Sequence, residues 1–255
     1  MDSVKGQQKE IRQSGNYISW YSCGPTVYDS SHVGHARTYV QIDLLQRILQ
    51  YRLGFNVYSA MGVTNIDDKI INKSKETGIP WRDIADKYEE EFLNDMRRLN
   101  VRKPMCLMHV SDMIPEIIDF IESLEAKGIA YKTSTGVYFD TQSALYSYSK
   151  LVPTSSDDDV QSRLSLDPEK RHPRDFALWK PSEETDYAWE SPWGKGRPGW
   201  HIECSVNCHS LFGDHLDIHA GGVDLKFPHH CNEIAQCEAY SGHDWCDIML
   251  HIGHM

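Results

Sequence analysis

The sequence predicts an α/β fold, a doubly wound parallel sheet whose two halves are separated by a connective insertion. Strand-like and helix-like segments alternate towards both ends of the chain. Between them lies a polar stretch rich in serine and aspartate, residues 154–174, which is typical of an exposed loop. We therefore expect the first half of the core at residues 1–100, the insertion at 101–190 and the second half at 191–255.

The opening third reads as a βαβ unit. A β-rich segment runs into a Cys-Gly-Pro turn, and the helical spacing that follows ends at Gly54. A second strand and a short helix come next. The expected strands are residues 17–22 and 55–60, and the expected helices are residues 35–53 and 67–74.

The later elements follow from the same patterns. Two amphipathic helices are predicted at residues 81–100 and 114–127, the second beginning at Pro115 and ending before Gly128. Further predicted elements are strands at 136–140, 216–219 and 248–251 and a helix at 229–240. Strands and helices therefore resume after the insertion, as a split sheet requires.

Composition narrows the class of protein. The chain has 255 residues with 40% hydrophobic and 25% charged, enough for one large domain or one domain with an insertion. No run of about 18 apolar residues is present, so we expect a soluble intracellular chain without a membrane partner. Seven cysteines are an odd number and argue against a disulfide framework. A net charge of −11 disfavours a protein that clamps nucleic acid over its whole surface.

The motif His32-Val33-Gly34-His35 follows the first strand and opens a helix. Two imidazoles three residues apart share a helical face, and a helix N-terminus favours phosphate through its N–H groups and its dipole. Gly34 has no side chain to keep a flat adenine off the backbone. The motif is short, and chance co-occurrence is the competing explanation for these four letters taken alone.

A second group of side chains could bind a metal ion. His229 and Glu233 are four residues apart on a predicted helix, so both can point at one ion. Cys23 ends a strand, and Cys204 lies in the segment WHIECS at 200–205. Thiolate, imidazole and carboxylate are all zinc ligands. Spacing alone leaves the ligand set open, because three further side chains compete for it: Cys208, His230 and Cys231.

Six motifs in order resemble those of the cysteinyl-tRNA synthetases. SCGPTVYD at 22–29, with His32 to His35 just after it, is the first; the others are TNIDDKI at 64–70, DFALWK at 175–180, GRPGWHIECS at 196–205, DIHAGGVDL at 217–225, and FPHH with NEIAQ at 227–236. Together they extend from about residue 16 to the end of the sequence.

The resemblance implies a Rossmann-type class I synthetase core that joins cysteine to tRNA(Cys) by way of cysteinyl-adenylate. It implies one zinc ion on Cys23, Cys204, His229 and Glu233, and ATP, with magnesium, on His32, Gly34 and His35. It further implies a cysteine pocket lined by Thr64, Trp200, His219 and Asp224. His32 and His35 would stabilise phosphate and ribose rather than act as general bases.

The sequence departs from the family pattern in several places. The family's Lys-Met-Ser-Lys-Ser loop should follow the strand at 248–250, and neither it nor an anticodon-binding region occurs in the 255 residues. We therefore expect a truncated chain that binds tRNA weakly and has little or no activity alone. Ala220 and Cys231 stand where we would expect glycine and an acidic residue. The motif wording indicates a eukaryotic or organellar form, so we expect a cytoplasmic protein, with the mitochondrial matrix as the alternative.

Two other functions remain open at this stage. One is a cysteine ligase that joins cysteinyl-adenylate to a small-molecule amine; the absent Lys-Met-Ser-Lys-Ser loop counts against it, because that enzyme needs the loop too. The other is a non-catalytic paralogue that keeps the fold as a binding module. The intact zinc and ATP positions weigh against decay of the site.

Overall fold

The computed structural model describes residues 2–4, 6, 8–11, 13, 15–143, 148, 150–152 and 167–253. These residues form two compact units, described in turn. Unit 1 comprises Met1–Asp112, Leu216–Asp224 and Cys246–Met255, and unit 2 comprises Met113–His215 and Leu225–Trp245. Most of the loop expected at 154–174, residues 154–166, lies outside the described residues.

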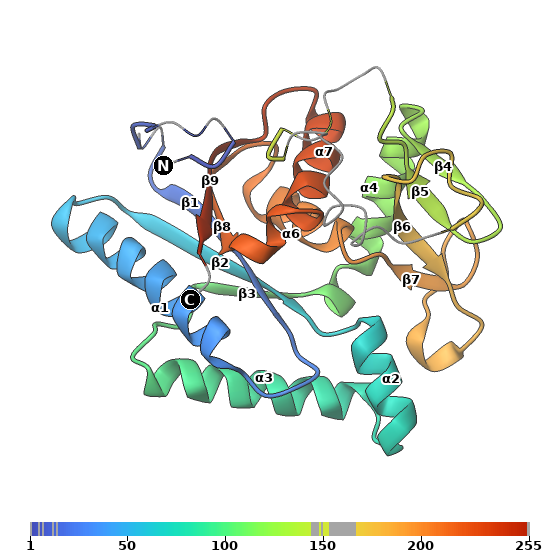
Figure 1. Ribbon diagram of the computed structural model, residues 1–255, viewed down its shortest axis with the longest axis horizontal. Helices are drawn as coiled ribbons and strands as arrows, with labels where there is room; N and C mark the ends of the chain where they lie inside the picture. The colour runs from blue at the N-terminus through green and yellow to red at the C-terminus, as the bar shows by residue number, and fades with distance from the viewer. Residues whose placement is uncertain are drawn as a thin grey trace. The chain divides into compact units, whose positions relative to one another are not determined.

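Unit 1 is built on a parallel five-stranded sheet in the order β3-β2-β1-β8-β9 (Figure 1). Its strands are β1 (Ile18–Thr26), β2 (Val57–Thr64), β3 (Cys106–His109), β8 (Leu216–Gly222) and β9 (Cys246–Ile252). The parallel α/β sheet predicted from the sequence is therefore confirmed. The central strands are nearly continuous runs of buried residues, as expected for a parallel sheet.

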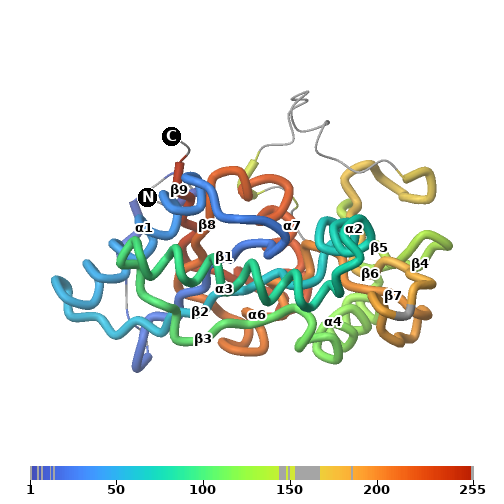
Figure 2. Tube along the Cα trace, turned by 90° about the horizontal axis from the view of Figure 1, so that it is seen from below, coloured from blue at the N-terminus to red at the C-terminus, as the bar shows by residue number. Residues whose placement is uncertain are grey.

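The helices of unit 1 connect these strands. They are α1 (Val33–Arg47), which continues as a π-helix η1 (Ile48–Arg52), then α2 (Asp68–Thr77), α3 (Trp81–Arg98) and the short 3₁₀ turn η2 (Val110–Asp112). Helices α1 and α3 lie on one face of the sheet (Figures 1 and 2). Tyr39 of α1 meets Phe92 of α3 edge to face, above Trp20 and Met61 of the sheet. This apolar layer fixes α1, and with it the helix N-terminus that carries His32.

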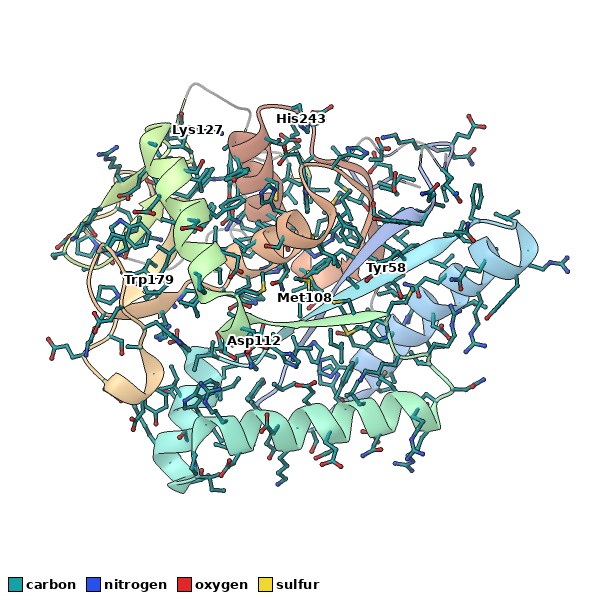
Figure 3. The ribbon with its side chains drawn as sticks, turned by 180° about the vertical axis from the view of Figure 1, so that it is seen from behind. Tyr58, Met108, Asp112, Lys127, Trp179 and His243 are labelled. Carbon is teal, nitrogen blue, oxygen red and sulfur yellow. The ribbon has the colours of Figure 1, made fainter. Side chains whose placement is uncertain are left out.

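In its described residues, unit 2 combines a four-stranded antiparallel sheet with three helices. The strands pair in the order β4 (Ala130–Lys132), β5 (Val137–Phe139), β6 (Phe176–Pro181) and β7 (Gly196–Pro198). Helices α4 (Ile114–Ala126), α6 (Ile202–Phe212) and α7 (His229–Ser241) pack on one another. Trp179 of β6 (Figure 3) is 1% exposed, and its ring centroid lies 6.0 Å from that of Trp193.

Two short 3₁₀ turns complete the described structure, η3 (Thr185–Tyr187) and η4 (Val223–Lys226). No helix in the described part of the chain combines the length and the apolar character needed to cross a membrane.

The prediction of a turn at Cys-Gly-Pro, residues 23–25, is wrong. β1 continues to Thr26, and its pairing with β2 becomes irregular between Cys23 and Thr26. A Cβ atom on Gly24 would lie 2.0 Å from the carbonyl oxygen of Gly62. Gly24 is therefore needed where two neighbouring strands approach closely, which is a different use of glycine from a turn.

Candidate nucleotide and metal sites

The direction of strand order reverses between β1 and β8 in unit 1. β2 and β3 follow β1 on one side, while β8 and β9 lie on the other. In open parallel sheets, ligands bind outside the carboxyl ends of the strands at such a reversal. His32 lies a few residues beyond the carboxyl end of β1 and caps helix α1. The histidine motif therefore stands where a nucleotide site is expected.

His32 and His35 interlock at the N-terminus of α1. The Nδ1 atom of His32 accepts a hydrogen bond from the Gly34 N–H at 3.1 Å, and the His32 N–H donates to Nδ1 of His35 at 3.3 Å. Their rings stack with centroids 3.9 Å apart. The structure thus brings together the two histidines predicted to bind ATP. It also shows that their own side chains occupy two of the N–H groups expected to meet phosphate.

Gly34 has a steric role in this arrangement. A Cβ atom on Gly34 would lie 2.9 Å from Cε1 and 3.0 Å from Nδ1 of His32. Contacts this short require the imidazole to move, so only glycine lets His32 fold over the first turn of α1.

The charge of His35 depends on its neighbours in unit 1. Burial lowers the pKa of His35, the nearby His32 lowers it further, and the carboxylate of Asp224 opposes both. His35 is therefore mainly neutral at pH 7, able to donate a hydrogen bond from one ring nitrogen and accept one at the other.

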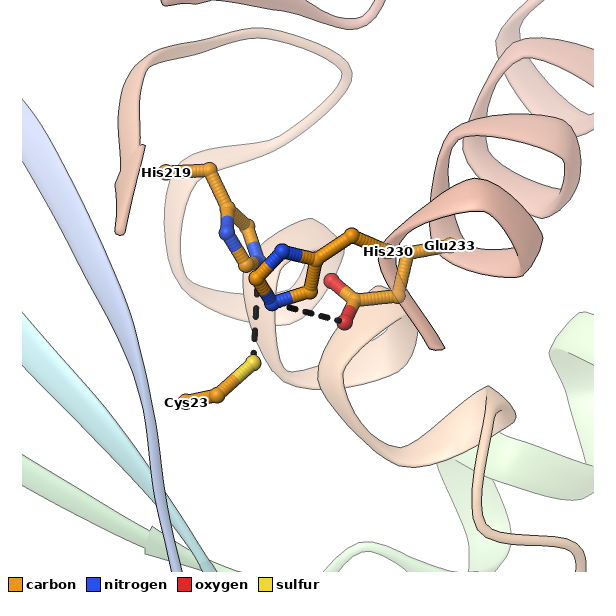
Figure 4. A group of neighbouring side chains, drawn as sticks. All are labelled: Cys23, His219, His230 and Glu233. Atoms are coloured by element: carbon orange, nitrogen blue, oxygen red, sulfur yellow. Dashed lines mark hydrogen bonds and ion pairs between the residues drawn. The ribbon is translucent and has the colours of Figure 1, made fainter. Parts of the chain in front are cut away.

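Three of the residues predicted to bind cysteine lie at or near the carboxyl ends of strands in unit 1. Thr64 ends β2, His219 lies in β8, and Asp224 lies in η4 directly after β8. His219 is fully buried, and its Nε2 atom lies 3.9 Å from Sγ of Cys23 (Figure 4). Trp200, the fourth predicted pocket residue, belongs to unit 2 and is 36% exposed.

Three of the four predicted metal ligands converge within unit 2. Cys204 lies in α6, while His229 and Glu233 lie one turn apart in α7, and all three are buried. The sulfur, nitrogen and oxygen donor atoms of these three side chains all lie within 4.8 Å of one another. His229 Nε2 lies 2.8 Å from Glu233 Oε1. His230 Nε2 lies 3.9 Å from the same oxygen, as Figure 4 shows. The fourth predicted ligand, Cys23, ends a buried stretch of β1 in unit 1.

The charge balance of this three-donor cluster suits a cation. Burial by itself lowers the pKa of His229, but the Glu233 carboxylate and the Cys204 side chain outweigh it and raise the pKa to about 10. The two acidic groups therefore attract positive charge into a buried place. Sulfur, nitrogen and oxygen donors in reach of one another are the ligand types that Zn²⁺ takes. The residues present fit a zinc ion.

Two rings lie against His229: Trp200, which was predicted only as a pocket residue, and His201, which sequence reasoning missed. Trp200 stacks on the His229 ring with centroids 4.4 Å apart, and His201 places Nδ1 3.2 Å from Nδ1 of His229. Burial first, and His229 second, hold the pKa of His201 well below its usual range, so His201 is neutral. The only sequence signal for His201 was its place beside Trp200 and three residues before Cys204, inside the motif GRPGWHIECS.

The competing thiols are not part of this cluster. Among the described residues, neither Cys208 nor Cys231 joins a group of three or more possible metal ligands. Burial raises the pKa of the Cys231 thiol to about 12, so it stays protonated and is a poor ligand.

The comparisons with known proteins agree with these observations. A family model described as "tRNA synthetases class I (C) catalytic domain" matches residues 9–255. The chain is 50% identical over 244 residues to a cysteine–tRNA ligase of Encephalitozoon cuniculi, covering 95% of this chain and 51% of that protein. It is 46% identical to the cytoplasmic cysteine–tRNA ligase of Dictyostelium discoideum, covering 94% of this chain and 38% of that protein.

Mitochondrial relatives are similar to the same degree. A probable mitochondrial cysteine–tRNA ligase of Xenopus tropicalis is 53% identical, covering 93% of this chain and 41% of that protein. The relatives therefore include both cytoplasmic and mitochondrial forms. The chain spans roughly two fifths to one half of the length of these relatives.

Solved structures share the fold. Mycobacterium tuberculosis methionyl-tRNA synthetase in complex with methionyl-adenylate matches with a TM-score of 0.67 at 14% identity, over 92% of this chain and 57% of that one. At this identity the likeness supports the Rossmann-type architecture alone. The family match over nearly the whole sequence carries the assignment, and the chain therefore belongs to the tRNA synthetases class I (C) catalytic domain family.

Proposed function

We propose that the chain is the catalytic core of a cysteine–tRNA ligase, which activates cysteine with ATP and transfers it to tRNA(Cys). The observation that carries the proposal is the buried thiol, imidazole and carboxylate of Cys204, His229 and Glu233, gathered within one unit of a class I synthetase domain. We propose that these three side chains bind one zinc ion, with Cys23 as the fourth ligand that the sequence motifs indicate.

Zinc would supply the selection of cysteine over serine. The two amino acids differ by one atom, and an apolar pocket separates such near-isosteres by only about 1–3 kcal/mol. A bound zinc ion favours a substrate thiolate over an alkyl hydroxyl, which is far less acidic and a poorer soft ligand. The proposal therefore needs no separate editing domain to reject serine.

The protein side chains would hold the substrates in place for the chemistry. The cysteine carboxylate oxygen attacks the α-phosphorus of ATP, the bond to the bridging oxygen breaks, and pyrophosphate leaves. A ribose hydroxyl of the tRNA then attacks the carbonyl carbon of cysteinyl-adenylate, and AMP leaves. Phosphoryl chemistry depends on position and charge stabilisation, so His32 and His35 donate hydrogen bonds to phosphate and ribose, and magnesium accompanies ATP.

The cysteine pocket would combine charge with shape. We propose that Thr64, His219, Asp224 and Trp200 line it, as the motifs indicate. The Asp224 carboxylate would attract the substrate ammonium group by its opposite charge. A Cβ on Gly222 would lie 2.3 Å from the Oδ1 atom of Asp224. That contact shows that the absence of a side chain at 222 leaves room for the carboxylate.

Metal analysis of two cysteine variants tests the proposal. The wild-type chain should contain one zinc ion by mass, Cys204→Ser should lose both zinc and cysteine binding, and Cys208→Ser should keep both. Cys208 is the matched control because it is a buried thiol one turn further along α6. A Cys204→Ser variant that retains zinc and cysteine affinity would contradict the proposed ligand set.

A further inference from the structure

One buried side chain bonds to both helices that carry the three-donor cluster. Gln236 lies in α7, one turn after Glu233, and is 0% exposed. Its Nε2 atom lies 2.7 Å from the carbonyl oxygen of His201 and 3.3 Å from Oγ of Ser205, both at the start of α6. It also lies 3.0 Å from the carbonyl oxygen of Asn232 in its own helix.

The chemistry of these contacts fixes the orientation of the amide. Carbonyl oxygens only accept hydrogen bonds, so the group that faces both His201 and Asn232 has to be the NH₂ group of Gln236. A glutamate of the same shape would set a carboxylate oxygen against two carbonyl oxygens. The position therefore requires a neutral donor, beyond simply filling space.

The bridge ends on residues that are next to the metal donors in the chain or in contact with them. Ser205 follows Cys204 in α6, and His201 is the residue whose ring meets the ring of His229. Gln236 thus connects the first turn of α6, with the thiol donor, to the helix that carries the imidazole and the carboxylate. Loss of the bridge would let α6 slide relative to α7 and separate Cys204 from Glu233.

A second contact steadies α7 on another side. The hydroxyl of Tyr148 donates to Oδ1 of Asn232 at 2.5 Å, next to Glu233. Lys150 pairs with Glu238 at 2.7 Å and with Asp244 at 2.9 Å. Burial raises the pKa of Tyr148, so its hydroxyl remains a donor.

We propose that Gln236 is a positioning residue for the zinc ligands, holding α6 and α7 in the register that brings Cys204, His229 and Glu233 together, and that Tyr148 supports it through Asn232. The inference rests on the proposed zinc site. It assigns roles to two residues that touch neither the metal nor the substrates.

Zinc affinity and the visible spectrum of the Co²⁺-loaded chain test the role of Gln236. Removing such a supporting partner typically weakens metal binding about 10- to 100-fold. We expect a loss of this size for Gln236→Met and a larger one for Gln236→Glu, with a changed Co²⁺ ligand-field band in both. Affinity is measured by chelator competition, and folding by circular dichroism. A folded Gln236→Met chain with wild-type affinity and spectrum would overturn the inference.

Two Tyr→Phe variants give an answer even if the Gln236 variants do not fold. Tyr148→Phe removes the bond to Asn232. Tyr138, which lies in β5 of the same unit, is the control, because Tyr138→Phe removes a similar 2.7 Å bond to Asp167. We expect zinc affinity to fall for Tyr148→Phe and to stay at the wild-type value for Tyr138→Phe. Equal behaviour of the two variants overturns the inference, whereas a wild-type chain that binds no zinc contradicts the proposed function itself.

Discussion

His32 has two separable tasks at the start of α1. Its ring caps the helix by accepting the Gly34 N–H, and the same ring is proposed to meet ATP. A helix cap and a ligand contact respond differently to substitution, because the cap needs only a hydrogen-bond acceptor whereas the contact needs the imidazole.

Substitution of His32 should separate these tasks. His32→Ala should lower the free energy of unfolding by about 0.5–1 kcal/mol through loss of the cap, while His32→Asn, a good capping residue, should leave it near the wild-type value. Both should weaken ATP binding. Urea denaturation and calorimetric titration with ATP measure the two effects. If His32→Asn binds ATP with the wild-type affinity, the His32 imidazole does not contribute to ATP binding.

The ion pair between His109 and Glu89 makes the stability of unit 1 depend on pH. His109 Nε2 lies 2.8 Å from Glu89 Oε2, and Asp112 and Asp86 lie near the same ring. The hydrogen bond that the His109 ring donates to the Glu89 carboxylate raises the pKa of His109 above the ordinary value of 6.5. The pair therefore stabilises the folded chain below about pH 6.5, and this stabilisation is lost as the pH rises through the raised pKa.

The difference in unfolding free energy between wild type and His109→Gln should accordingly be larger near pH 6 than near pH 9. Urea titrations at the two pH values measure it. Glu89→Gln should abolish the same pH-dependent difference, since it removes the carboxylate. A difference that is constant with pH would show that the pair adds nothing to stability.

At the scale of elements, a buried carboxylate fastens helix α1 to the segment before β3. Asp43 accepts from Arg47 Nε at 2.7 Å and from Arg102 Nε at 2.6 Å. Arg102 also donates to Gln50 Oε1 in η1 at 2.5 Å. The π-helical end of α1 is therefore held by side chains from a different part of unit 1.

Asp43→Asn should destabilise the chain by about 1–3 kcal/mol, because two guanidinium groups lose a charged acceptor. The control is Asp95→Asn, which breaks an exposed pair with Arg98 in α3 and should cost about 0.5 kcal/mol or less. Urea denaturation compares them. Equal losses of unfolding free energy in the two variants would mean that the buried contacts of Asp43 stabilise the chain no more than the exposed pair does.

The elements also show what the sequence can and cannot predict. Helix α3 was predicted because its apolar positions recur at helical spacing, and it begins at the predicted residue, Trp81. Helix α6 was not, because apolar and polar residues alternate from Ile202 to Cys208 instead of recurring at helical spacing, and the polar ones are buried with the rest. β7 and β4 have three residues each, too few for any alternation to be recognised.

The site divides in the same way. Motif resemblance named the three donors of unit 2, and the structure gathers them. The resemblance includes Gln236 in a motif but assigns it no role. Its partners are mostly backbone carbonyl groups, which every residue type has. Such bonds depend on the packing of α6 against α7, so only the structure reveals them.

At the scale of the whole molecule, the two proposed steps, selection of the amino acid and release of pyrophosphate, need different side chains. Amino-acid selection uses side chains that this chain contains: the three-donor cluster, Cys23 and the predicted pocket residues. Release of pyrophosphate needs positively charged groups beside the negative leaving oxygens, and the Lys-Met-Ser-Lys-Ser motif expected from the resemblance would supply them. That motif does not occur in the 255 residues.

The 255 residues alone should therefore bind zinc and cysteine but exchange pyrophosphate into ATP slowly. Loss of one preorganised donor to a developing oxyanion typically costs about 100- to 1,000-fold in rate, so exchange should fall at least about 100-fold below that of the full-length Encephalitozoon cuniculi relative. Charging of tRNA(Cys) should be weaker still. The measurement is cysteine-dependent exchange of labelled pyrophosphate, with Cys204→Ser as the blank and zinc content determined on the same samples. Exchange close to the rate of the relative would show that residues within the described chain already neutralise the leaving group.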